Sequence, residues 1–303
     1  MEFTIYQGSV QGGRAVNQDR YAYTYGRDTL LLVAADGMGG HVGGEVAAQI
    51  CVRLVVERFH QEAKPVLRRP GAFLRDTLAR VHDALISYAY QVSAAETPRT
   101  TCVACVVQAG HAYWAHAGDS RLYLFRGERL RAETRDHTRV RELAERGVID
   151  YLAADTHPER SRVFSCLGGY SAPTIDVGPP TELAEGDLIV LSTDGFWSMI
   201  KPEEIVRALS VKSVVIAAPL LLREAERRGG PGGDNATVIA VRWGPEVLTN
   251  APDATITEAL PQGKFETHLG RAAIGRGAGE GALVPTDEEI DRAIAEIRAK
   301  IER

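Results

Sequence analysis

The sequence predicts an α+β fold in which two pairs of helices cover a two-layer, mostly antiparallel β core. Short β-rich runs alternate with helix pairs rather than with single helices, which argues against a doubly wound parallel sheet. The chain has 303 residues, enough to bury a full core without disulfide bonds. Its hydrophobic fraction of 45% and charged fraction of 25% are those of a globular protein, so a disordered or fibrous chain is excluded.

Eight short runs rich in β-branched and aromatic residues are typical of strands. Apolar residues recur at helical spacing in four longer segments, which come in two pairs. The predicted strands cover residues 3–9, 21–25, 30–35, 102–107, 112–117, 122–125, 188–192 and 237–242. The predicted helices cover residues 45–60 and 70–88, and then 202–209 and 214–228.

Residues 131–169 form a polar, charged stretch with one short predicted helix at 138–146, and we call this stretch the flap segment. We expect it to lie over the surface rather than in the core. Residues 1–243 are predicted to form one domain, followed by a flexible linker at 244–285 that is rich in Gly, Pro, Ala and Thr. Residues 286–303 predict an amphipathic C-terminal helix with an isoleucine seam. That helix either docks on its own domain or binds a partner or a second copy.

Charge and hydropathy exclude several classes of protein. The net charge of -5 argues against broad binding to nucleic acid or to an anionic membrane. The sequence has no signal peptide and no apolar run long enough to span a bilayer, so we expect a cytoplasmic protein. The four cysteines do not make a disulfide scaffold. Cys102 and Cys105 lie three apart on a predicted strand, so their side chains should point to opposite faces and pack in the core.

Aspartates recur beside the predicted strands. Asp36, Asp119 and Asp194 each follow an apolar strand next to a glycine, Asp234 directly precedes one, and Asp19 lies near the N-terminus. Any one of them is explained by turn chemistry, since Asp and Gly both favour tight turns. Several carboxylates gathered at the edge of a core repel one another unless a cation lies between them. Oxygen donors without a His/Cys pair favour Mg²⁺ or Mn²⁺ over Zn²⁺.

Six sequence motifs, in a fixed order along the chain, contain these aspartates and resemble those of a known family. They are R-x-x-N-Q-D, A-D-G-M-G-G-H-x-G-G-E, G-D-S-R, D-H-T-x-V-x-E-L-x-E-x-G, S-T-D-G and G-G-D-N-x-T-V, and they span about residues 5 to 243. The set resembles the bacterial PPM (type 2C) metal-dependent Ser/Thr protein phosphatases. The resemblance implies a phosphatase domain at residues 1–243 with the four-layer α-β-β-α sandwich of that family.

The resemblance also implies a ligand set for two cations. Asp36 corresponds to the carboxylate that bridges both of them, and the Gly37 carbonyl to a ligand of the second. Asp194 and Asp234 correspond to the other ligands of the first cation. Asp19 resembles the acidic residue that holds the water shell of the second.

Further positions follow from the same resemblance. Asp119 resembles the ligand of a third, weaker cation, shared with Asp194. Ser161 falls where some members place a flap ligand to that cation. Arg14 resembles the arginine that binds the substrate phosphate, and a planar guanidinium suits two phosphate oxygens. Asn235 is a further candidate within its motif.

The general acid is left open by the sequence. Eukaryotic members have a histidine directly after the Asp-Gly pair, and Met38 occupies that position here. His41 lies three residues further on. It is either the acid or a residue that orders the glycine-rich turn.

These residues predict a protein Ser/Thr phosphatase with two to three Mn²⁺ or Mg²⁺ ions. Two such ions lower the pKa of a bridging water, and the resulting hydroxide attacks phosphorus in line. The implied partners are phosphorylated proteins and a cognate bacterial Ser/Thr kinase. A catalytically weak phosphoprotein-binding module is one alternative, against which the complete ligand set argues. Another is a two-metal phosphohydrolase acting on nucleotides, although the sequence has no G-x-x-x-x-G-K-[ST] loop.

Overall fold

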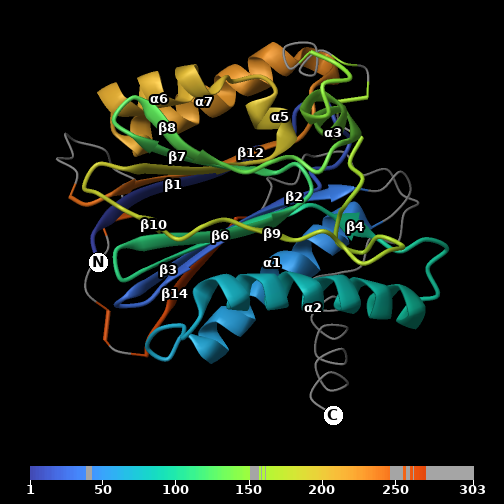
Figure 1. Ribbon diagram of the computed structural model, residues 1–303, viewed down its shortest axis with the longest axis horizontal. Coiled ribbons are helices and arrows are strands. Elements are labelled where there is room, and N and C mark those ends of the chain that lie inside the picture. The colour runs from blue at the N-terminus through green and yellow to red at the C-terminus, as the bar shows by residue number, and fades with distance from the viewer. Residues whose placement is uncertain are drawn as a thin grey trace.

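The computed structural model describes residues 1–38, 43–150, 157, 159–160, 162–245, 255–256, 260–261 and 263–270. Two β-sheets lie face to face, and a pair of helices covers the outer face of each (Figure 1). The helices are α1 (Gly44–Glu62), α2 (Pro70–Gln91), α3 (Arg139–Glu145), α5 (Asp194–Trp197), α6 (Pro202–Val211) and α7 (Val214–Gly229). The predicted four-layer α-β-β-α sandwich is thus confirmed.

All strand pairs of the described residues are antiparallel. The six-stranded sheet has the order β13 (Thr255–Ile256), β1 (Phe3–Val10), β12 (Ala236–Trp243), β11 (Leu188–Ser192), β7 (Arg121–Arg126), β8 (Arg129–Glu133). The eight-stranded sheet has the order β10 (Thr181–Glu182), β6 (His111–Ala117), β5 (Cys102–Gln108), β3 (Thr29–Met38), β2 (Asp19–Tyr25), β14 (Glu266–Gly270). Two short strands complete it, β4 (Arg99–Thr100) on β3 and β9 (Asp176–Val177) on β6.

The central strand β3 is apolar at each position from Leu30 to Ala35 because both of its faces are covered. Leu31 and Val33 face the core formed with α1 and α2, whereas Leu30 and Leu32 face the core between the two sheets. This alternation follows from the two-residue period of a strand, and a strand covered on both faces needs apolar side chains on both. Cys102 and Cys105 divide in the same way between the two cores, as predicted.

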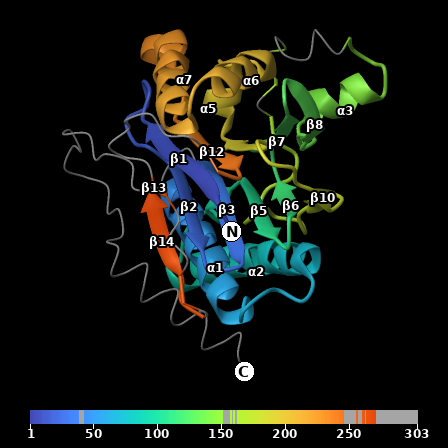
Figure 2. The same cartoon turned by 90° about the vertical axis from the view of Figure 1, so that its left-hand side faces the viewer.

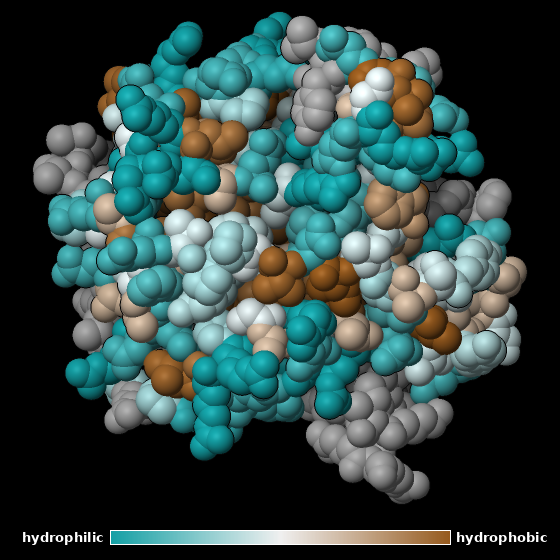
Figure 3. All heavy atoms as spheres, in the orientation of Figure 1, coloured by the Kyte–Doolittle hydropathy of each residue, from teal (hydrophilic) through white to brown (hydrophobic). Residues whose placement is uncertain are grey.

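A third core lies between the six-stranded sheet and helices α5, α6 and α7. It contains Phe196, Ile205, Leu222 and Val238, all buried. On the face seen in Figure 3, polar side chains predominate and apolar ones form separate small groups. None of the helices in the described ranges combines the length and the hydropathy that a bilayer crossing requires.

The flap segment contains the short helix that the sequence predicts. Helix α3 begins after Thr138, whose hydroxyl accepts a hydrogen bond from the Arg141 N–H at 3.3 Å. Strand β8, which the sequence analysis did not predict, leads into it from the edge of the six-stranded sheet. The segment therefore starts on the sandwich itself.

Part of the predicted flexible linker at 244–285 is instead in strands. Residues 255–256 pair with β1, and β14 pairs with β2 along its whole length (Figure 2). Tyr23 stacks on His268 with ring centroids 4.5 Å apart, and the Tyr25 hydroxyl donates to Glu266 at 2.6 Å. Strand β14 thereby covers the otherwise open edge of β2. The predicted C-terminal helix at 286–303 lies outside the described residues.

Candidate metal centre

Strands β2 and β3 place two of the predicted ligands side by side. Asp19, the first residue of β2, is the direct cross-strand partner of Asp36 near the end of β3. Opposed residues of an antiparallel pair project to the same face, so the two carboxylates lie together. Gly37 follows Asp36, and a Cβ at this position would lie 2.0 Å from the Gly44 carbonyl oxygen. Only glycine fits that close backbone approach.

The six-stranded sheet supplies two more ligands at the same end of the sandwich. Strand β11 ends at Ser192, and Asp194 then begins the short helix α5. Asp234 lies two residues before β12, which pairs with β11. The carboxylates of both sheets therefore converge where the ends of the sheets meet.

The electrostatics of the carboxylates confirm this convergence. Desolvation raises the pKa of Asp36 well above its ordinary value, and Asp19, Asp194, Asp119 and Asp234 raise it further by repulsion. Desolvation likewise raises the pKa of Asp19 to about 7 and, with repulsion from Asp234, that of Asp194 to about 6. Such crowding is costly unless positive charge compensates it.

Two oxygen atoms of this cluster test directly whether a cation fits. Oδ2 of Asp19 accepts hydrogen bonds from the hydroxyls of Thr193 at 2.8 Å and Thr237 at 2.6 Å. Its Oδ1 and Oδ1 of Asp194 are buried, and no donor among the described residues reaches either of them. Buried carboxylate oxygens are normally satisfied. Two that are not, in a site of oxygen donors, fit a hard divalent cation such as Mg²⁺ or Mn²⁺.

Asp119 lies at the edge of the same cluster. It is only 2% exposed, and desolvation, followed by repulsion from Asp194, raises its pKa well above the ordinary value. A structural role for Asp119 as the ion-pair partner of Arg121 is not what the structure shows. Arg121 instead forms a two-point ion pair with Asp136. This leaves Asp119 next to Asp194, as a shared third cation would require.

Arg14 reaches the cluster from the solvent side. Its Nη2 lies 2.6 Å from Oδ2 of Asp234, and its side chain is 59% exposed. The guanidinium is thus at the rim of the site. Asn235 organises the loops behind it, because its Oδ1 accepts the Gln18 N–H at 2.8 Å and its Nδ2 donates to the Gln11 carbonyl at 2.8 Å. His41 and Ser161 lie outside the described residues.

Sequence reasoning missed the residues that hold these ligands in place. Thr193 and Thr237 orient Asp19, and the Thr101 N–H donates to the Asp36 carbonyl at 2.8 Å. The available signal was a threonine in, or directly after, an otherwise apolar strand, close to a candidate aspartate. Without a partner in view, that signal does not separate a hydrogen-bonding role from ordinary β propensity.

The structure is thus an α-β-β-α sandwich whose two sheets both contribute aspartates to one end, and this arrangement is that of the PPM-type phosphatase fold. A family model for protein phosphatase 2C matches residues 9–220, and the chain belongs to that family. The resemblance inferred from the six motifs is thereby confirmed.

Three known proteins illustrate the similarity. "Serine/threonine protein phosphatase PstP" of Mycobacterium tuberculosis is 34% identical over 235 residues, which cover 75% of this chain and 42% of that protein. "Serine/threonine phosphatase stp" of Listeria monocytogenes is 29% identical over 243 residues, covering 79% and 94%. A solved structure of the PstP catalytic domain in complex with two manganese ions has a TM-score of 0.65 at 29% identity, covering 79% of this chain and 98% of that one. The chain thus spans about two fifths of the length of the first relative.

Proposed function

We propose that this protein is a metal-dependent phosphatase that hydrolyses phosphoserine and phosphothreonine in proteins. The observation that carries the proposal is the convergence of Asp19, Asp36, Asp194 and Asp234 around two buried oxygens that have no donor in the described part of the chain. Membership of the protein phosphatase 2C family and the names of the relatives support the same activity.

The residues divide into two groups by sheet. Asp19, Asp36 and the Gly37 carbonyl come from the eight-stranded sheet, whereas Asp194 and Asp234 come from the other side of the sandwich. Together they would hold a pair of Mn²⁺ or Mg²⁺ ions, and the two manganese ions bound to the similar PstP domain favour manganese. When bound, such a pair activates a water for attack on phosphorus and neutralises phosphate charge.

The chain's own residues position the carboxylate ligands and neutralise the charge of the substrate phosphate. Thr193 and Thr237 fix one oxygen of Asp19, so the other is held in a defined direction. Arg14 sits at the rim with most of its side chain in solvent, where it can meet a phosphate and bind two of its oxygens. Its contact with Asp234 places the guanidinium beside the carboxylate cluster before substrate arrives.

The test is metal-dependent release of phosphate from a phosphothreonine peptide, compared with release from nucleotides. We expect release from the peptide with Mn²⁺ or Mg²⁺, loss on chelation, and little release from nucleotides. Preference for nucleotides would favour the phosphohydrolase alternative. Metal binding and phosphopeptide binding without turnover would favour a phosphoprotein-binding module.

The physiological substrates follow from the same proposal. Phosphoserine and phosphothreonine in bacterial proteins are products of Ser/Thr kinases, so a cognate kinase is the expected counterpart. Proteins that gain phosphate when the gene is deleted, and lose it again on complementation with the wild type but not with Asp36→Asn, would be its substrates.

A further inference from the structure

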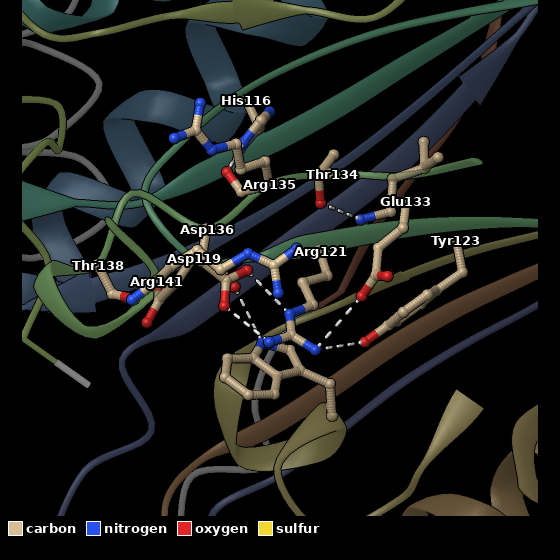
Figure 4. Close-up of polar contacts among 12 residues, drawn as sticks. His116, Asp119, Arg121, Tyr123, Glu133, Thr134, Arg135, Asp136, Thr138 and Arg141 are labelled. Carbon is tan, nitrogen blue, oxygen red and sulfur yellow. Dashed lines mark hydrogen bonds and ion pairs between the residues drawn. The ribbon is translucent and has the colours of Figure 1, made fainter. Parts of the chain in front are cut away.

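Arg121, the first residue of β7, is a cation with only 13% of its side chain exposed. Its Nε and Nη2 donate to the two carboxylate oxygens of Asp136 at 2.8 and 2.7 Å, and Nη1 donates to the Tyr123 hydroxyl at 3.1 Å (Figure 4). Its guanidinium carbon lies 3.6 Å from the ring centroid of Trp197. Arg121 therefore joins the flap segment, which contains Asp136, to helix α5, which contains Trp197.

Trp197 continues this connection to the candidate metal centre. Its indole Nε1–H donates to the backbone carbonyl of Asp119 at 2.9 Å, and the side chain is buried. Trp197 is the last residue of α5, and Asp194 is the first. One turn of helix thus carries the candidate ligand Asp194 at its first residue. Its last residue, Trp197, binds the backbone of the second candidate ligand, Asp119. The spacing of Asp119 and Asp194 depends on this indole.

The other end of the Asp119 turn is held by the residue after Asp136. The His137 N–H donates to the Gly118 carbonyl at 2.9 Å, and the Gly118 N–H donates to Nδ1 of His137 at 3.2 Å. Consecutive flap residues therefore hold the turn at both ends, His137 at Gly118 and Asp136 at Arg121. A displacement of these two flap residues must move Asp119.

Each of the two histidines at this position already uses one ring nitrogen in a hydrogen bond to the backbone. His116, His137 and Asp176 bring ligand atoms within 4.8 Å of one another. Because Nδ1 of His137 accepts the Gly118 N–H, its Nε2 carries the proton of the neutral ring and has no lone pair for a metal. Nε2 of His116 lies 2.7 Å from the Arg135 carbonyl, to which it donates. The cluster thus holds flap residue Arg135 as well.

Resting on the proposed function, we propose that Arg121 and Trp197 are positioning residues that couple flap residues 135–137 to Asp119. Through Asp119 and Asp194 they set the affinity of a weakly bound third divalent cation. Partners that orient a metal ligand affect metal binding strongly although they do not touch the metal. The tightly bound pair of cations shares Asp194 with the third but also has Asp36, the Gly37 carbonyl and Asp234, so it should be much less sensitive to this network.

Two variants test the coupling. Trp197→Phe keeps an aromatic ring beside Arg121 but removes the N–H that holds Asp119, together with part of the ring volume. Asp136→Asn removes the charge of the two-point ion pair with Arg121, which also contacts Glu133 at 3.4 Å. Trp243→Phe makes the same substitution at the last residue of β12, at the end of that strand away from Asp234, and serves as the matched control. Asp119→Ala gives the limiting effect. Each protein is titrated with Mn²⁺ by calorimetry, and kcat and KM are measured on a phosphothreonine peptide.

For Trp197→Phe and Asp136→Asn we expect the tight Mn²⁺ sites to change little and the weakest Mn²⁺-binding step to lose about tenfold in affinity. We expect kcat to fall about tenfold at fixed Mn²⁺, with KM within about twofold of wild type. Raising Mn²⁺ should restore most of the kcat of these variants and none of that of Asp119→Ala. Trp243→Phe should behave as wild type in each measurement.

Wild-type values of the weak Mn²⁺ step and of kcat in Trp197→Phe, with only a lower Tm, would overturn the coupling and leave a structural role. A wild-type isotherm without a weaker step would overturn it as well. Failure of the proposed function is a separate result, since it would show as Mn²⁺ binding without phosphopeptide hydrolysis. The isotherms of the variants would still decide the coupling in that case.

Discussion

At the scale of single residues, the centre is defined by carboxylates that the fold holds together against their mutual repulsion. Desolvation raises the pKa of Asp36, and repulsion from the other four aspartates raises it further. Hydrogen bonds from two threonines stabilise one oxygen of Asp19 but leave the other without a donor from any described residue. The native arrangement is therefore stabilised by a bound cation and strained without one.

Asp36→Asn removes a buried charge that the other four aspartates repel. We expect kcat to fall by roughly a factor of 10³ or more, since a shared ligand of the cation pair is lost. The metal-free variant should melt higher than metal-free wild type, because a repulsive buried charge is gone. Asp83→Asn, on the exposed face of α2, is the control for both measurements. Full activity of Asp36→Asn at saturating Mn²⁺ would falsify the assignment.

Arg14→Ala should raise KM for a phosphopeptide more than it lowers kcat, because a phosphate contact present in both ground and transition states is lost. The loss in kcat/KM should be about 1.5–3 kcal/mol, the scale of a charge-assisted hydrogen bond. Arg14→Lys keeps the positive charge but lacks the planar guanidinium, so its kcat/KM should lie between those of wild type and Arg14→Ala. If steady-state kinetics of Arg14→Ala match wild type, the contact with Asp234 is the only role of this side chain.

At the scale of elements, β14 shows how a short segment far along the chain completes a sheet. It pairs with β2, residue for residue from Tyr21 to Tyr25. The Tyr25–Glu266 hydrogen bond and the Tyr23–His268 stack lie on it. The candidate centre lies beyond the other end of this pairing, at Asp19. Removal of β14 should therefore lower the stability of the domain without lowering its catalytic activity.

A chain ending at Gly244 lacks both β14 and the two-residue strand β13, whereas a chain ending at Gly270 keeps both. We expect the shorter chain to lose about 3 kcal/mol in the free energy of unfolding, from the exposed edge of β2 and the lost aromatic and hydrogen-bond contacts. Turnover of a small phosphopeptide well below Tm should be retained in both. Denaturant unfolding of the two chains measures the difference. Equal stability would mean that β14 contributes nothing to the edge.

At the scale of the whole molecule, the centre connects the two sheets. Asp19 and Asp36 belong to one sheet and Asp194 and Asp234 flank strands of the other, so a bound cation links the two halves of the sandwich. Cation binding should accordingly stabilise the complete domain rather than one element, since only the native fold brings the ligands together.

Mn²⁺ at a hundredfold excess over its Kd should raise Tm by about 5–10 °C in wild type and by much less in Asp36→Asn. The effect depends on pH. The pKa values of Asp19, about 7, and Asp194, about 6, lie above the unfolded value of 3.8, so their contribution to stability is full below 3.8 and is lost as pH rises through 6 and 7. The metal-free protein should thus melt lower at pH 8 than at pH 5.5, and Mn²⁺ should raise Tm more at pH 8. Melting curves with and without chelator measure both.

The sequence determined the long elements and the candidate ligands. Strand β3 contains an uninterrupted apolar run, helix α1 has apolar residues at helical spacing, and the aspartates occur in motifs whose order is itself informative. Local pattern and spacing suffice for these, because a buried strand needs apolar residues and a hard cation needs carboxylates.

Only the tertiary structure decided the remainder. Strand β14 is five residues at a sheet edge, and its own sequence does not show that β2 leaves an edge open. Thr237 donates to Asp19 across 218 positions of the chain, and Trp197 reaches the Asp119 carbonyl across 78. Such contacts depend on which elements the fold packs together. A polar side chain in an apolar strand acquires its role only when its partner is brought within hydrogen-bond distance.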